Sequence, residues 1–202
     1  MKLERAEALF ATPLLVFRLE GAEALNAQLS SEALERRRNE PGLERSNRGG
    51  WHSADDFFRR SEPGAQALQH QVVQAITQAT LHVSPRFPLS RYGLQVEGWI
   101  NINGQGAMNA PHDHPGWVWS GCYYVAVELD AGGALELLDH RTNIRTLTVD
   151  GADCFASKHR HQPQAGELVI FPSWLRHWVE PNLGKQDRIS IALNARYVAH
   201  GS

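Results

Sequence analysis

Two kinds of hydrophobic pattern divide the chain. In the first third of the chain, residues 22–38 are rich in Ala, Leu, Glu and Arg, and the apolar positions of residues 61–82 recur every three or four residues; both patterns favour helices. Helices are therefore predicted at residues 22–38 and 61–82. The second has its buried positions at Leu68, Val72, Ile76 and Ala79. The apolar stretch 9–17 is predicted to be an edge strand, because Pro13 lacks the amide hydrogen that a central strand requires.

From Tyr92 onward the pattern changes to short runs rich in β-branched and aromatic residues, separated by glycine-rich or polar turns. The runs are LQVEGWININ, WVWSGCYYVAVEL, ALELLD, RTLTV, ELVIFP, HWVEP and RISIALNARY. Many short strands with regular turns indicate an all-β sandwich or barrel. We therefore expect a single, mainly β domain over residues 1–202. Residues 1–90 supply helical and strand support, and 91–200 form a barrel or jelly-roll core of about eight strands, with the helices packed on one sheet.

Composition narrows the classes of partner. The chain has 202 residues and a formal net charge of −2, so neither nucleic acid nor a membrane surface is expected as a partner. The apolar N-terminal stretch follows acidic residues and lacks a cleavage site, so no signal peptide is predicted. Cys122 and Cys154 are interpreted as reduced thiols, which favours a cytoplasmic location. A homodimer is left open.

Three of the ten histidines have a pattern that suggests metal binding. His112 and His114 lie in the segment PHDHP, which Pro115 biases toward an extended conformation. In an extended segment residues i and i+2 share a face, so the two imidazoles can project together while Asp113 points away. His177 follows 63 residues later, between two predicted strands. A barrel could bring it to the same edge and form a facial ligand set with open positions. The alternatives are a coincidental loop pair and a hydrogen-bonded histidine at the barrel mouth.

A second cluster is a weaker candidate. Cys154, His159 and His161 could form a thiolate–imidazole zinc set, but Lys158 and Arg160 would repel a cation. A solvated basic loop is the preferred interpretation. Surface positions or ordinary packing are expected for the isolated histidines, which are His52, His70, His82, His140 and His200.

The order of the motifs resembles a known family. The segments HDHPGWVWSGCYYV, GGALELLD, GELVIFPSWLRHWVEPN and RISIALN resemble a bacterial family of 2-oxoglutarate–iron(II) oxygenases, distant relatives of the prolyl 4-hydroxylases. The resemblance is strongest over residues 97–197, and the segments LFATPLLVF and GGWHS are similar to the family's opening. It implies a double-stranded β-helix, that is, a jelly roll with helices bracing one sheet.

The resemblance also implies a ligand set and cofactors: Fe(II), 2-oxoglutarate (2OG) and O2. Carried onto this chain, the first and last iron ligands are His112 and His177. The middle position, usually Asp or Glu, falls on His114. Three neutral imidazoles would leave the ferrous centre at its full charge. Asp113 could supply a carboxylate only if the loop turned its side chain inward.

The expected co-substrate site lies on the last strand. Arg188 could grip the distal carboxylate of 2OG through two parallel hydrogen bonds, and Ser190 shares its strand face. By similarity, Tyr124 contacts the same carboxylate while Tyr123 faces the opposite side. Asn103 and Asn194 are further candidate contacts, as is Asn101. Four tryptophans are interpreted either as pocket lining or as packing: Trp117, Trp119, Trp174 and Trp178.

The resulting hypothesis is a non-haem Fe(II)/2OG oxygenase that hydroxylates an unactivated C–H bond of a small molecule or peptide. The alternative is a cupin-like three-histidine metalloprotein, a dioxygenase or an isomerase, that does not use 2OG. A metal-free β-sandwich that binds small molecules or a protein is a third reading. Arg188 with Ser190 argues against the cupin-like alternative, in which that pair has no evident function, and the metal-free alternative would leave three convergent histidines unexplained.

Overall fold

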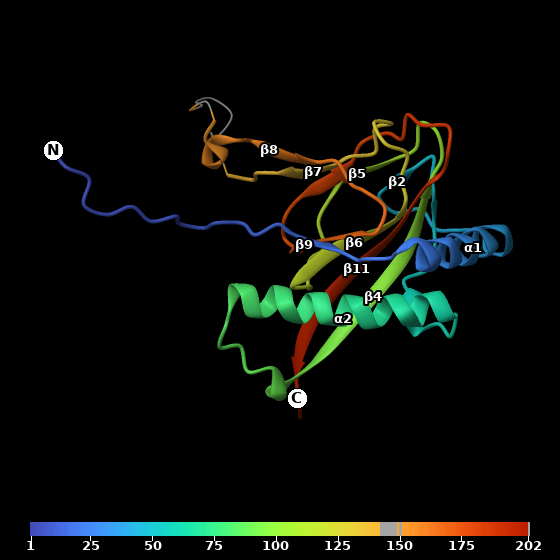
Figure 1. Cartoon of the computed structure of the whole chain (residues 1–202), viewed down its shortest axis with the longest axis horizontal. Helices are drawn as coiled ribbons and strands as arrows, with labels where there is room; N and C mark the ends of the chain where they lie inside the picture. The colour runs from blue at the N-terminus through green and yellow to red at the C-terminus, as the bar shows by residue number, and fades with distance from the viewer. Residues whose placement is uncertain (142–148, 150, 202) are drawn as a thin grey trace.

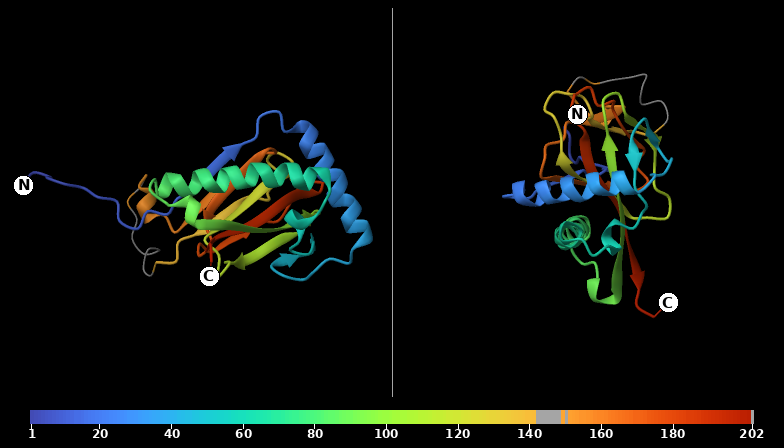
Figure 2. Two further views of the ribbon diagram at one scale, coloured as in Figure 1. Left: turned by 90° about the horizontal axis from the view of Figure 1, so that it is seen from below. Right: turned by 90° about the vertical axis from the view of Figure 1, so that its right-hand side faces the viewer.

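The computed structural model describes residues 1–141, 149 and 151–201. Two antiparallel sheets face each other, and two helices cover the outer face of one sheet (Figures 1 and 2). The six-stranded sheet has the order β1 (Leu15–Arg18), β9 (Glu167–Pro172), β6 (Trp119–Ala126), β11 (Arg188–Ala199), β4 (Tyr92–Asn103) and β3 (Trp51–His52). The five-stranded sheet has the order β2 (Asn47–Arg48), β5 (Met108–His112), β10 (His177–Val179), β7 (Leu135–Leu138) and β8 (Lys158–His161). The predicted jelly-roll fold class is confirmed.

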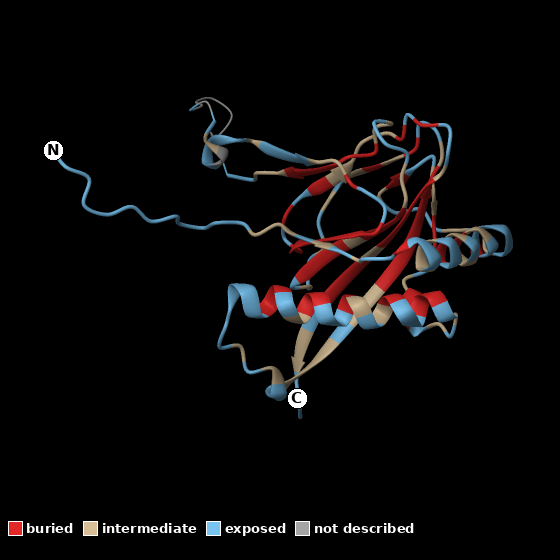
Figure 3. Cartoon of the chain, viewed as in Figure 1, coloured by how far each residue is buried: buried red, intermediate tan, exposed pale blue. Residues whose placement is uncertain are grey.

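The helices are α1 (Glu23–Asn39) and α2 (Pro63–Val83), close to the predicted ranges. Pro63 occupies the first turn of α2, where its missing amide hydrogen costs nothing. The predicted apolar face of α2 is buried against the six-stranded sheet (Figure 3). Three short 3-10 helices lie at Phe57–Arg59, Leu89–Arg91 and Asp153–Phe155.

The central strand β11 separates the apolar core from the site. It pairs with β4 along its whole length and with β6 on its other side. Its odd-numbered residues from Ile189 to Ala195 lie in the core beneath the helices. Because successive side chains alternate across a strand, the even-numbered residues Arg188, Ser190 and Ala192 face the other sheet. We call this side of the six-stranded sheet the inner face.

Several short elements differ from the predictions. Strand β1 covers Leu15–Arg18 rather than 9–17, and the residues before it extend away from the body as exposed chain (Figure 1). The described chain has eleven strands rather than about eight. Strands β2 and β3 have two residues each, which is too few to show any periodicity. The charged segment Lys158–His161 forms strand β8 instead of the predicted basic loop. The predicted strand RTLTV falls mostly outside the described residues.

In the part of the chain that the structure describes, no helix combines the length and apolar character that crossing a membrane requires.

Candidate metal and co-substrate site

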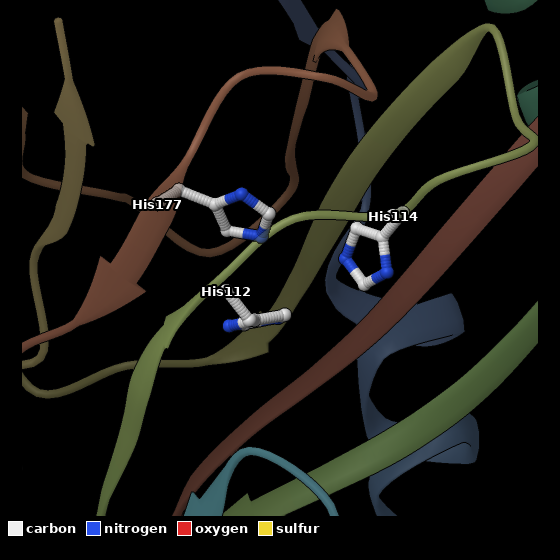
Figure 4. A group of neighbouring side chains, drawn as sticks. All are labelled: His112, His114 and His177. Atoms are coloured by element: carbon white, nitrogen blue, oxygen red, sulfur yellow. The ribbon is translucent and has the colours of Figure 1, made fainter. Parts of the chain in front are cut away.

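The three candidate histidines come together where β5 ends and β10 begins, two neighbouring inner strands of the five-stranded sheet (Figure 4). His112 ends β5 and pairs across the sheet with His177, the first residue of β10. His114 reaches the same point from the turn that follows β5. One potential ligand atom from each ring lies within 4.8 Å of the other two. The ring centroids of His112 and His177 are 4.4 Å apart, and that of His114 lies 4.9 Å and 5.2 Å from them.

Backbone carbonyls orient two of the rings. Nδ1 of His112 lies 2.7 Å from the Ala110 carbonyl, and Nδ1 of His177 lies 2.9 Å from the Leu175 carbonyl. A carbonyl oxygen only accepts, so Nδ1 carries the proton and donates in both cases. The neutral ring then has its lone pair on Nε2. A hydrogen bond of this kind is the device that prepares a histidine to bind a metal.

The surroundings keep the imidazoles neutral. Burial, reinforced by the neighbouring His112, lowers the pKa of His177 to about 3. Burial also lowers the pKa of His114 to about 4, with further contributions from His112 and His52, and it lowers that of His112. All three rings are therefore unprotonated at neutral pH, which is the form that binds a cation.

The alternative carboxylate ligand does not face the cluster. The side chain of Asp113 is exposed, as the extended-segment argument predicts, whereas the histidines on either side are partly buried. Trp99 and Phe171 form walls beside the rings. The Trp99 ring lies 5.5 Å from His114, and the Phe171 ring lies 4.8 Å from His177.

Arg188 is a buried cation without a carboxylate partner among the described residues. The residue is only 4% exposed. One guanidinium nitrogen donates to Ser190 Oγ at 3.2 Å, and the guanidinium carbon lies 5.1 Å from the centre of the Tyr124 ring. Its Nε and Nη2 atoms are buried and have no hydrogen-bond partner. A buried guanidinium is costly unless an anion pairs with it, so this arrangement fits a ligand that carries a carboxylate.

Other unpaired polar atoms share the same interior. Tyr124 is fully buried and its hydroxyl lacks a partner, and the side-chain oxygen of Asn101 is also unpaired. Both residues line a narrow cavity of about 40 Å³, together with Arg188, Ser190 and the three histidines, and this cavity is partly open to solvent. Buried polar groups normally have partners. The cavity therefore combines a metal-binding end with an anion-binding end.

The two other candidate amides are placed differently. Asn103 donates to Asn109 at 3.0 Å, and its own oxygen is buried and unpaired. Asn194 accepts a hydrogen bond from Ser120 at 2.7 Å and donates to Glu97 at 3.1 Å. Neither Asn103 nor Asn194 is among the residues that line the cavity. Their positions therefore do not support the predicted direct contact with the co-substrate.

The four predicted tryptophans do not line the cavity. Trp119 lies in the core beneath the helices and donates to Thr80 at 3.0 Å. Trp178 donates to Glu136 at 2.8 Å, Trp117 stacks under Arg196, and Trp174 is half-exposed. The packing interpretation is thus confirmed for Trp119, whereas Trp174 neither lines the cavity nor is buried.

Sequence reasoning missed Trp99 and Cys122, which line the cavity. His52 is buried and stacks on Trp99 with ring centroids 5.5 Å apart, which agrees with the packing position expected for it. The alternation of β4 could have identified Trp99, since it lies two residues before Asn101. The same alternation in β6 places Cys122 on the face of Tyr124.

The two histidines of the second candidate cluster, His159 and His161, lie on β8 rather than in a loop, whereas Cys154 lies in the short helix Asp153–Phe155. Of these residues, His161 lies 3.2 Å from Glu167.

Tyr123 faces away from the cavity as predicted, and its hydroxyl donates to Asn26 on α1 at 2.8 Å.

Comparisons with known proteins agree with this geometry. Residues 97–194 match the family described as "Putative 2OG-Fe(II) oxygenase". No curated protein is significantly similar to the chain in sequence.

Solved structures share the fold at low sequence identity. A prolyl-4-hydroxylase of Pseudomonas putida has a TM-score of 0.62 and 19% identity, over 93% of this chain and 94% of that one. A Trichoplax adhaerens prolyl hydroxylase, solved with a hypoxia inducible factor peptide fragment, has a TM-score of 0.61 and 15% identity, over 90% and 82%. An alpha ketoglutarate dependent carbocyclase from nogalamycin biosynthesis has a TM-score of 0.64 and 12% identity, over 91% and 79%.

The jelly roll, the convergent histidines and the buried unpaired arginine all lie within or beside the matched segment. Residues 97–194 of this chain match the 2OG-Fe(II) oxygenase family, and all three convergent histidines lie in that segment.

Proposed function

We propose that the protein is an Fe(II)- and 2OG-dependent oxygenase that hydroxylates a C–H bond of a small molecule or peptide, with His112, His114 and His177 as its iron ligands. The observation that carries the proposal is Arg188. Its buried, unpaired guanidinium shares one cavity with a set of three neutral histidines. A cupin-like metal site without 2OG would give no reason to bury that charge.

The protein's own groups have separate tasks in this proposal. The guanidinium of Arg188, with the hydroxyls of Ser190 and Tyr124, binds the distal carboxylate of 2OG and fixes the direction in which the co-substrate lies. Ala110 and Leu175 hold Nδ1 of their histidines, so that Nε2 points toward the metal. When bound, Fe(II) and 2OG supply O2 activation coupled to oxidative decarboxylation of 2OG to succinate and carbon dioxide.

The histidine at the middle position affects the charge of the centre. With three neutral ligands the protein does not offset the charge of Fe(II), whereas a carboxylate would. His114 also fills the position that halogenating relatives of this chemistry would leave vacant for halide. Hydroxylation is therefore the proposed outcome.

The class of the primary substrate follows from the comparisons only in broad terms. One structural neighbour was solved with a peptide fragment, and another is a carbocyclase from an antibiotic biosynthesis. Either a peptide or a small metabolite is consistent with a cavity partly open to solvent. We also propose a cytoplasmic location. The proposal is the same for a monomer and for a homodimer.

Sequential anaerobic addition of Fe(II) and 2OG tests the proposal. Fe(II) followed by 2OG should produce a weak visible absorption band, and admission of air should produce succinate. Arg188→Met should bind Fe(II) but show no band with 2OG. Metal binding without any effect of 2OG on absorption or succinate would instead support the cupin-like alternative.

A further inference from the structure

The inner face of the six-stranded sheet is arranged in levels between the anion-binding and metal-binding ends. We call a set of cross-strand neighbours at one level a rung. Ser190 pairs with Tyr124 and forms the first rung, where the Arg188 guanidinium is held. Ala192 pairs with Cys122 and forms the second. Successive rungs on one face are about 7 Å apart, since each residue of a strand advances about 3.3 Å.

The metal end lies at and beyond the second rung. His177 packs on Phe171, which pairs with Ser120, and Ser120 lies one rung further along β6 than Cys122. His114 packs on Trp99, which pairs with Ala192. A co-substrate that bridges the guanidinium and the three histidines must therefore cross the rung of Cys122 and Ala192.

Trp99 and Val169 flank this rung, and the two side chains between them, Ala192 and Cys122, are small and uncharged. Ala192 contributes one methyl group, and the Cys122 thiol lies beside Ser190 and Tyr124, with burial raising its pKa so that it stays protonated. The Cys122 side chain also packs against the apolar cluster that contains Val169, its partner on β9, and Phe171. Such a surface suits methylene groups rather than a carboxylate.

We infer that Cys122 is the wall against which the methylene chain of 2OG lies, so that the size of this residue sets the chain length of the 2-oxo acid that the enzyme accepts. The inference rests on the proposed use of 2OG. It explains why a protonated thiol lines the cavity although the binding of iron and carboxylate does not require it.

Direct binding measurements test the inference without turnover. Calorimetry with the redox-inert ion Mn(II) compares 2OG with 2-oxoadipate, which is one methylene longer. The wild type should prefer 2OG by about tenfold or more, because one misplaced methylene in an apolar pocket has an effect of that order. Cys122→Ala should reduce the preference to about threefold or less, and Cys122→Leu should weaken 2OG binding by about tenfold while Mn(II) still binds.

A matched control lies on the same strand. Tyr123 is the chain neighbour of Cys122 but faces α1, so Tyr123→Phe should leave both 2-oxo acid affinities unchanged. Thermal unfolding of each variant establishes that it is folded. In a Cys154→Ser background, where Cys122 is the single thiol, bound 2OG should also slow alkylation of Cys122, as measured by intact mass.

The outcomes separate the inference from the proposed function. If 2OG binds the wild type, but Cys122→Leu binds it equally well and Cys122→Ala keeps the full preference over 2-oxoadipate, the inference is overturned while the function stands. If the wild type does not bind 2OG in the presence of Mn(II) or Fe(II), the proposed function fails and the inference fails with it.

Discussion

Replacing Arg188 with methionine should have opposite effects on the free and the ligand-bound protein. In the free protein the guanidinium is 4% exposed, and two of its nitrogen atoms lack partners. Methionine has a similar length and carries no charge to bury. We therefore expect Arg188→Met to stabilise the ligand-free protein and to abolish its stabilisation by 2OG.

The magnitude follows from the contacts of the side chain. Each unsatisfied buried donor costs about 1–3 kcal/mol, so removing two recovers roughly 2–6 kcal/mol. Loss of the Ser190 hydrogen bond and of the contact with the Tyr124 ring costs about 1–3 kcal/mol in total. The midpoints of the two ranges differ by about 2 kcal/mol, which is the expected net gain in the free energy of unfolding. Loss of two charge-assisted hydrogen bonds to the carboxylate should weaken 2OG binding roughly 10²- to 10⁴-fold.

Urea unfolding and calorimetry measure the two effects. The midpoint should be higher for Arg188→Met than for the wild type without ligand, and the order should reverse when 2OG saturates the wild type in the presence of Mn(II). The Mn(II) affinity itself should change little, because the metal site lies at the other end of the cavity.

Arg36 provides a matched control. It is also buried, at 6% exposure, but it forms ion pairs with Glu40 at 2.9 Å and Asp56 at 3.0 Å. Arg36→Met should therefore lower stability, because it removes a buried guanidinium that pairs with two carboxylates and leaves them only Arg60 as an ion-pair partner. If Arg188→Met is destabilising to a similar degree, Arg188 is not an uncompensated charge and the reasoning is refuted.

Further predictions concern the metal site and its supports. His114→Asp installs the carboxylate usual at this position and should retain Fe(II) binding, whereas Asp113→Asn should change the Fe(II) affinity by no more than about twofold, because Asp113 is exposed. Competition with a chromogenic chelator measures both, and loss of binding in Asp113→Asn would identify that carboxylate as a ligand. The metal-free protein should lose stability from pH 7 to pH 5, because the pKa of His177 is about 3 when folded and 6.5 when unfolded, so only the unfolded chain gains the proton. His177 should account for about 2 kcal/mol of that loss in the free energy of unfolding. If urea unfolding of His177→Gln shows the same loss between pH 7 and pH 5 as the wild type, the assignment is contradicted. Gly133→Ala should weaken 2OG binding, since φ is +66° and an added Cβ would lie 2.8 Å from Arg188 Cδ. Calorimetry that finds unaltered affinity would show that Gly133 does not position the guanidinium.

Local periodicity made much of the fold predictable. The helical repeat of α2 identified its buried face, and alternation in β6 placed Tyr123 on the face opposite Tyr124, which lines the cavity. Alternation also placed Arg188 and Ser190 together and turned Asp113 outward. These features depend on which side of an element a residue occupies, and that is set by neighbours in the chain.

Short or charged strands were not predictable in this way. Strands β2 and β3 are held by pairing with β5 and β4, and β8 by pairing with β7, so their own residues carry little signal. The first predicted strand was displaced because only Leu15–Arg18 finds a partner, in β9.

The sequence by itself determined the types of chemistry: two histidines on one face of an extended segment, a third before the last strands, and an arginine two residues from a serine. Only the tertiary structure decided that these groups share one cavity. His177 lies beside His112 because of the register of β10 against β5. Two nitrogen atoms of Arg188 lack partners because no described segment places a hydrogen-bond acceptor beside them. Sequence patterns describe each element's own faces, whereas a site depends on distances between elements, and those are set by packing.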